Sequence, residues 1–401
     1  MLVIDWPETL RNLIGYGMAL GAVLLVGLLL FLFRRRLFDR FWPLQRLRPG
    51  AWTGFDVFVC FVIVIYTTDA VRRFLEAIGL FDVIFDQTPS FWRASRETRW
   101  TRELLWAYPL YFFLAIALVL LFLYLRTRTK TRHIGLTTAR WPQCVLQGLL
   151  GFAIATPLVL AVNLLAVMFL PERPHSLQNL PVQELWPIEW ALVFFQACVV
   201  APVLEELLFR GLLQGWLRRA SLTGHAMIGA LTLFIAAQPL LLSLSAEEDQ
   251  NIPSVEEAVQ PLIFAVLLVG VYGWQFYRVW GALLREGVFH LVEARPTSPA
   301  AADEDSETEP MPESGLHPLL RIDPERFAVF NAGNCRLSVL GSAMFFAIFH
   351  SSVWPTPIAL FGLGLVLGWL AYRTQSLVGA IVLHAFFNVV AFLVLLQTPS
   401  T

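Results

Sequence analysis

The feature that most constrains this chain is a series of long apolar runs, several of which contain no charged residue at all. A helix needs about 20 apolar residues to cross the hydrocarbon core of a bilayer. Six runs qualify without any charge: 13–33, 104–125, 145–170, 226–246, 258–277 and 355–372. A seventh run, 51–68, holds one acid. Three more runs contain ionisable groups: 190–210, 337–350 and 376–397.

The length and regularity of these runs decide the fold class. Lipid admits only helices and closed barrels as spanning structures. The runs are too long for barrel strands and do not alternate between polar and apolar residues. The sequence therefore predicts an all-α fold, a polytopic transmembrane helical bundle with about ten spans.

Composition agrees with a membrane protein and excludes several other classes. Apolar residues make up 57% of the chain and charged residues 15%, whereas soluble domains carry about 45–50% and about 25%. Disordered chains and coiled coils need still more charge. A net charge of -1 gives no reason to expect nucleic acid as a partner. The cysteines form no CxxC pair, which favours buried apolar filler over disulfides or a zinc knuckle: Cys60, Cys144, Cys198 and Cys335.

The distribution of Lys and Arg predicts the topology. Basic residues cluster after the first, third, fifth and seventh expected spans, at 34–36, 126–132, 218–219 and 278–285. Because basic loops stay in the cytoplasm, alternating crossings place both termini outside. We therefore expect an integral multi-pass protein of the cell membrane.

Two polar stretches lie between the expected spans. Residues 72–103 mix polar and aromatic side chains and predict a loop at the membrane interface. Residues 294–326 are rich in proline and acids, which is typical of a disordered linker.

One apolar run contains three charged side chains. Ionisable residues inside a membrane are functional candidates, because each costs about 2.5–3.5 kcal/mol on insertion scales. Glu206 and Arg210 are four residues apart and share a helix face, so we expect them to pair. Glu205 is turned about 100° away from that face and is left free for another role. The alternative is a helix end at which both acids meet headgroup water.

Two of the seven histidines lie inside apolar helices. His350 lies one turn after Phe346, and His384 shares a helix face with Asn388. A buried polar group needs a polar partner, so we expect these residues to converge with Glu205 in one cavity of the bundle. We expect the other histidines to be solvated, in loops or at helix ends: His133, His175, His225, His290 and His317.

A glutamate, two histidines and an asparagine provide the groups that a hydrolase needs. A desolvated carboxylate suits a general base for water, and a histidine beside it helps to hold that water. A second histidine and an asparagine can donate hydrogen bonds to an oxyanion. Glu205, His350 and His384 are also a set of zinc ligand types. Because three separate helices would supply them and no HExxH is present, we expect no cofactor and keep zinc as the alternative.

Three motifs in order resemble one family. Glu205 to Arg210 resembles the EExxFR motif of the CPBP (CAAX-protease and bacteriocin-processing, also called Abi) intramembrane proteases. Phe346 with His350 resembles the second motif, FxxxH, and His384 with Asn388 resembles the third, HxxxN. The resemblance covers roughly 145–397.

The resemblance implies an activity and a role for each motif residue. The eukaryotic members of this family are CAAX prenyl endopeptidases, which remove the last three residues of prenylated proteins. By this resemblance Glu205 would activate the water with His350 as its partner. His384 and Asn388 would form the oxyanion site, and three residues would support the motifs: Glu206, Arg210 and Phe346. The partners implied are membrane lipid and a membrane-anchored or prenylated-like protein substrate.

The resemblance also divides the chain. We expect N-terminal spans over 1–140 and the protease-like domain over 143–397, interrupted at about 222–335 by two extra spans and the linker. Two other functions remain as alternatives. One is a non-catalytic immunity or scaffold protein of the same family, and the other is a proton-coupled transporter that uses the buried acid and histidines.

Overall fold

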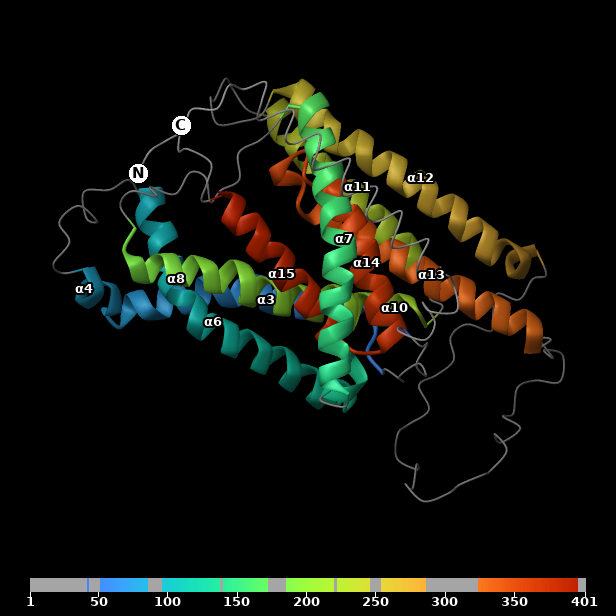
Figure 1. Ribbon diagram of the computed structural model, residues 1–401, viewed down its shortest axis with the longest axis horizontal. Coiled ribbons are helices and arrows are strands. Elements are labelled where there is room, and N and C mark those ends of the chain that lie inside the picture. Colours follow the sequence, from blue (N-terminus) through green and yellow to red (C-terminus); the bar gives the residue numbers. More distant parts are fainter. Residues whose placement is uncertain are drawn as a thin grey trace, which may run out of the picture.

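The computed structural model describes residues 42, 51–85, 96–137, 140–171, 185–219, 222–245, 254–285 and 324–395. Every regular element in these ranges is a helix (Figure 1). The helices before the first motif are α3 (Gly54–Ala77), α4 (Leu80–Phe85), α6 (Arg96–Thr127), η1 (Thr131–Ile134) and α7 (Trp141–Phe169). Five consecutive segments then form one compound helix: α8 (Pro187–Phe195), η3 (Gln196–Val200), α9 (Ala201–Glu205), η4 (Glu206–Leu213) and α10 (Gln214–Leu217). The remaining elements are α11 (Leu222–Ser245), α12 (Val255–Arg285), α13 (Pro324–Phe349), η5 (Ser351–Val353), α14 (Pro357–Thr374) and α15 (Val378–Leu395).

The structure confirms an all-α membrane bundle. Eight described helices are long and apolar enough to cross a membrane, and Val378–Leu393 is a shorter apolar helix. These helices correspond to the last nine of the ten runs expected from the sequence. The first run, 13–33, and most of the expected linker at 294–326 lie outside the described residues. The protein is therefore an integral multi-pass membrane protein.

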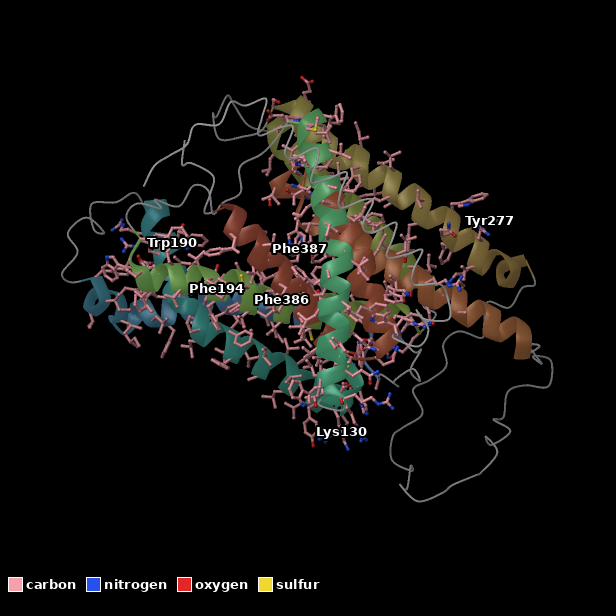
Figure 2. The ribbon with its side chains drawn as sticks, viewed as in Figure 1. Lys130, Trp190, Phe194, Tyr277, Phe386 and Phe387 are labelled. Atoms are coloured by element: carbon pink, nitrogen blue, oxygen red, sulfur yellow. The ribbon has the colours of Figure 1, made fainter. Side chains whose placement is uncertain are left out.

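The outer surface of the bundle is apolar, as lipid requires. Tyr277 projects from α12 away from the other helices (Figure 2) and is 55% exposed. Trp274 on the same helix is 62% exposed. So many exposed apolar side chains would favour aggregation in water, but they are expected on a surface that faces the lipid hydrocarbon.

The prediction of an interfacial loop at 72–103 is wrong for most of these residues, which are helical. Arg72 lies within α3, and Glu103 lies within α6. The Arg72 guanidinium donates to the Glu103 carboxylate at 2.8 Å. The polar side chains that suggested a loop therefore join two packed helices.

The compound helix runs without a break from Pro187 to Leu217, and two of its segments are π-helical. Pro202 lacks an N–H and its ring crowds the preceding turn. The π-helical segment η3 ends at Val200, two residues before Pro202, and a wider turn at this place leaves more space for the ring. Glu205 lies twelve residues before the Leu217 end of this helix, about three helical turns inside the bundle.

Side chains from three other helices, or from just before them, bond to carbonyls of the π-helical segments. Ser342 Oγ donates to the Phe209 carbonyl at 2.9 Å, and the Trp52 indole donates to the Leu212 carbonyl at 2.9 Å. Asn388 Nδ2 donates to the Ala197 carbonyl at 2.7 Å. A π-helical turn disturbs the regular backbone ladder, and these bonds hold it in place from outside.

The part of the chain before residue 140 contacts the compound helix near both of its ends. Arg102 of α6 donates two hydrogen bonds of 2.8 Å each to the Glu189 carboxylate of α8. Both side chains are buried, at 2% and 0% exposure. At the other end, a Cβ on Gly215 would come within 2.7 Å of the Trp52 ring, so only glycine permits this approach. These contacts cross the predicted domain boundary at 140.

On the opposite side, α11, α12 and α13 pack together (Figure 1) around a polar cluster. His225 is buried here, so its expected solvation is wrong. Its Nδ1 is hydrogen-bonded to the Tyr272 hydroxyl, and its Nε2 contacts Asn334 Oδ1 at 2.9 Å. Asn334 Nδ2 in turn donates to the Leu217 and Arg218 carbonyls at 3.3 and 3.0 Å. The histidine is thus part of a link between this helix trio and the end of the compound helix.

The third side is formed by α7, α14 and α15, and α7 crosses the other two in Figure 1. A Cβ on Gly148 of α7 would lie 2.5 Å from the Gly379 carbonyl of α15. This close approach brings α15, and with it the third motif, tightly into the bundle.

The buried Arg102–Glu189 pair should dominate the stability of the N-terminal attachment. Glu189→Ala leaves the Arg102 charge buried without its partner, which should cost about 3–5 kcal/mol. The thermal unfolding midpoint of the detergent-purified protein measures the effect. Arg73→Ala is the control, because the Arg73 side chain is 70% exposed in its pair with Asp69 and should matter little. Equal midpoints for both variants would contradict this role of the pair.

Candidate functional site

Three helices bring Glu205, Glu206, His350 and His384 together in the middle of the bundle. Glu205 ends α9 and Glu206 begins η4 on the compound helix. His350 directly follows α13. His384 lies in the second turn of α15. Residues far apart in the sequence therefore meet because α13 and α15 both pack against the compound helix.

The carboxylate of Glu205 lies between the two histidines. Its Oε1 is 3.9 Å from His350 Nε2, and its Oε2 is 3.8 Å from His384 Nε2. Both separations are too long for direct hydrogen bonds. A water oxygen about 2.8 Å from both atoms would bridge either pair. The arrangement can hold a water against the carboxylate and an imidazole.

Both imidazole rings are anchored through their other nitrogen. His350 Nδ1 is 2.8 Å from the Phe346 carbonyl, and His384 Nδ1 is 2.9 Å from Glu206 Oε1. Carbonyl and carboxylate oxygens only accept hydrogen bonds, which assigns a proton to each Nδ1. In the neutral rings each Nε2 therefore turns a lone pair toward Glu205.

Glu206 has the expected partner and a second one that the sequence did not indicate. Its Oε1 accepts from Arg210 Nη1 at 2.8 Å and also from His384. The side chains of Glu206 and Arg210 are both 0% exposed. A buried charge pair needs added hydrogen bonds to be tolerated, and His384 supplies one. The sequence marked Glu206 only as one of two adjacent acids, and nothing in it pointed to His384 as a partner of Glu206.

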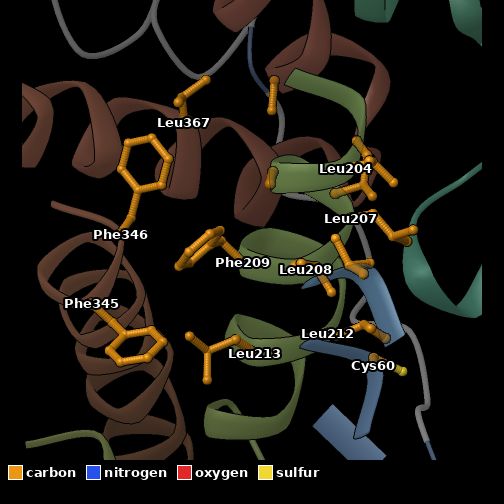
Figure 3. Close-up of a cluster of buried hydrophobic side chains, with 14 of the residues drawn as sticks. Cys60, Leu204, Leu207, Leu208, Phe209, Leu212, Leu213, Phe345, Phe346 and Leu367 are labelled. Atoms are coloured by element: carbon orange, nitrogen blue, oxygen red, sulfur yellow. The ribbon is translucent and has the colours of Figure 1, made fainter. Parts of the chain in front are cut away.

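The ring of Phe346 packs against Arg210 and both histidines. Its ring lies 4.3 Å below the Arg210 guanidinium carbon and meets the His384 ring edge-on at 5.8 Å. Figure 3 shows Phe346 and Phe345 of α13 facing Phe209 of the compound helix. The cation–π contact stabilises a desolvated guanidinium, and three phenylalanine rings form an apolar wall beside it.

Asn388 lies one turn beyond His384 on α15. One of its amide hydrogens is committed to the Ala197 carbonyl of η3. Sequence reasoning placed Asn388 in the site but gave no sign of this bond.

Sequence reasoning missed Tyr111 of α6. Its hydroxyl is hydrogen-bonded to Thr68 of α3, and it lies within electrostatic range of the Glu205 carboxylate. Tyr111 lies in an ordinary apolar run outside the motifs, so no pattern in the sequence could have marked it. The N-terminal helices thus contribute to the surroundings of Glu205.

The three candidate zinc ligands do not fit a metal site as they are placed. Two ligands of one tetrahedral zinc, with bonds of about 2.0–2.1 Å, lie about 3.4 Å apart. The Nε2–oxygen separations here are 3.8 and 3.9 Å. Within the described ranges, no group of three or more His, Cys, Asp or Glu residues could hold a metal ion. The expectation that the protein needs no cofactor stays a prediction.

The protein-family model described as "Type II CAAX prenyl endopeptidase Rce1-like" matches residues 187–292 and 325–390. Comparison with curated proteins gives no significant match, and comparison with solved structures gives none either. The match includes α11 and α12, which we had expected to be an insertion at about 222–335. It omits 293–324, which nearly coincides with the expected linker.

Both matched segments contain motif residues. Glu205, Glu206 and Arg210 lie in the first segment. The second holds the other four candidates, Phe346, His350, His384 and Asn388. The match thus agrees with the resemblance inferred from the motifs. Over these two segments the chain is similar to the type II CAAX prenyl endopeptidase Rce1-like family.

Proposed function

We propose that this protein is an intramembrane endopeptidase of the cell membrane that hydrolyses a peptide bond near the C-terminus of a membrane-anchored, prenylated-like protein. The observation that carries the proposal is the Glu205 carboxylate, which lies 3.9 and 3.8 Å from the Nε2 atoms of two anchored histidines. The family description supports the class of substrate.

Glu205 is the general base in this proposal. A water between Glu205 and His350 donates one proton to the carboxylate and is oriented by the Nε2 lone pair. The water oxygen attacks the carbonyl carbon of the scissile bond as Glu205 takes up the proton. Glu205 then passes that proton to the leaving amine, so the carboxylate is regenerated. General base catalysis of this kind contributes about 10²–10⁴-fold.

His384 stabilises the charge that develops on the carbonyl oxygen. When both of its ring nitrogens carry a proton, Nδ1 stays on Glu206 and Nε2 is a donor directed to the reacting groups. Glu206 and Arg210 hold the ring in this orientation. A donor that is already oriented needs no rearrangement during the reaction.

Asn388 is the second oxyanion donor in the proposal. One amide hydrogen is bonded to the Ala197 carbonyl, so the oxyanion would accept from the other. The bond to Ala197 ties α15 to η3, which also fixes the direction of the free N–H.

Exposure favours a reactive site over a cluster kept only for packing, which is the alternative of a non-catalytic scaffold. The Glu205 and His350 side chains are 25% and 26% exposed. The purely structural pair of this protein, Arg102 and Glu189, is 2% and 0% exposed. A packing cluster gains nothing from access, whereas a catalytic base must be reached by water and substrate.

Glu205→Gln tests the base directly. The amide keeps the size of the side chain but cannot take up the water proton, so kcat should fall by about 10² or more. Cleavage of a prenylated C-terminal peptide, and separately of an unmodified transmembrane peptide, measures the change. The thermal midpoint should stay near that of the wild type. Full activity of a folded Glu205→Gln protein would remove this residue from the mechanism and favour the scaffold alternative.

Glu206→Gln should reduce both stability and activity. It leaves the Arg210 charge buried without a counter-ion, which should cost about 3–5 kcal/mol. It also releases His384 Nδ1 from a charged acceptor, so turnover per folded molecule should fall. Glu256→Gln on α12 is the matched control, because that acid is exposed. A variant that keeps the wild-type midpoint and turnover would show that Glu206 does not brace the site.

A further inference from the structure

A small cavity adjoins Arg210 at the end of the bundle where the compound helix meets the turn between α14 and α15. The space open to the centre of a water-sized sphere is about 20 Å³. A single ordered water needs about 10–15 Å³ by this measure. Polar side chains form much of the wall: His133, Arg210, Gln214, Arg218, Gln375 and Ser376.

Arg210 presents two unused donors beside this cavity. Its Nη1 is bonded to Glu206, but its buried Nε and Nη2 have no hydrogen-bond partner. These two N–H groups point along one edge of the guanidinium. Arg102 uses the same edge to bind both oxygens of Glu189. Arg210 therefore offers a pre-formed pair of donors inside the bundle.

Gln214 lines the same cavity and has an unused acceptor. Its Nε2 donates to the Gly368 carbonyl at 2.9 Å, which fixes the orientation of the amide because a carbonyl only accepts. Its Oε1 is buried and has no hydrogen-bond partner. An occupant that satisfies both residues has to accept from Arg210 and donate to Gln214.

We propose that this cavity binds one ordered water, which joins Arg210 to Gln214 and holds the guanidinium behind the Glu206–His384 contact. A water both accepts and donates, so it satisfies the two groups together. A small anion would satisfy Arg210 but would face the lone pairs of Gln214 Oε1. A peptide carboxylate is likewise an acceptor only and would leave Gln214 Oε1 without a donor. The positioning of His384 by this water rests on the proposed function, whereas the water site itself does not.

The direct test is a cryo-EM map of the full chain in lipid nanodiscs, at a resolution that shows ordered water. We expect one compact peak within about 2.7–3.2 Å of Gln214 Oε1 and of at least one of Arg210 Nε and Nη2. An elongated or stronger feature that contacts only Arg210 would indicate an anion and overturn the proposal. An empty cavity in a map that shows other buried waters would overturn it as well.

Gln214→Leu tests the role of the water. It removes the acceptor, so the peak should disappear and kcat should fall about tenfold with KM unchanged, because small misplacements of catalytic groups slow chemistry. Gln238→Leu on α11 is the control, since that amide bonds within its own helix and both peak and kcat should persist. Unchanged kcat in folded Gln214→Leu would refute the positioning role. If the wild type cleaves no peptide, the proposed function fails while the map still decides the water site.

Discussion

The site depends on one buried carboxylate that accepts two hydrogen bonds. Glu206 Oε1 receives Arg210 Nη1 and His384 Nδ1, which joins the compound helix to α15 in a place that excludes solvent. Because this oxygen orients the imidazole, His384 Nε2 is turned toward Glu205. In the proposed mechanism the first acid is thereby left free for chemistry, and the second is committed to structure. We propose different roles for these two adjacent glutamates because they contact different partners.

The rest of the bundle keeps this contact in place. The compound helix carries both acids and Arg210, and its π-helical segments are held by side chains from other parts of the chain, among them Trp52, Ser342 and Asn388. The N-terminal helices are attached to it by the ion pair between Arg102 of α6 and Glu189 of α8, although the family match begins only at residue 187. These helices therefore belong to the structural unit that positions the site, although they lie outside the matched segments.

Much of the fold followed from the sequence, because apolar length alone marks a spanning helix. The pairing of Glu206 with Arg210 followed from helical spacing, which predicts contacts within one helix. Spacing cannot say which residues of different helices meet. The contacts of Arg102 with Glu189, of His225 with Asn334 and of His384 with Glu206 join residues 87, 109 and 178 positions apart. His225 was misjudged for this reason, since its partners lie on two other helices.

The most direct test of the account is product analysis by mass spectrometry in H₂¹⁸O. The purified full chain in nanodiscs is incubated with a prenylated C-terminal peptide, and wild type is compared with Glu205→Gln. The account predicts a shortened peptide whose new carboxylate carries one ¹⁸O, formed by wild type and nearly absent with the variant. An intact peptide after incubation with folded wild-type protein, or equal cleavage by both proteins, would contradict it.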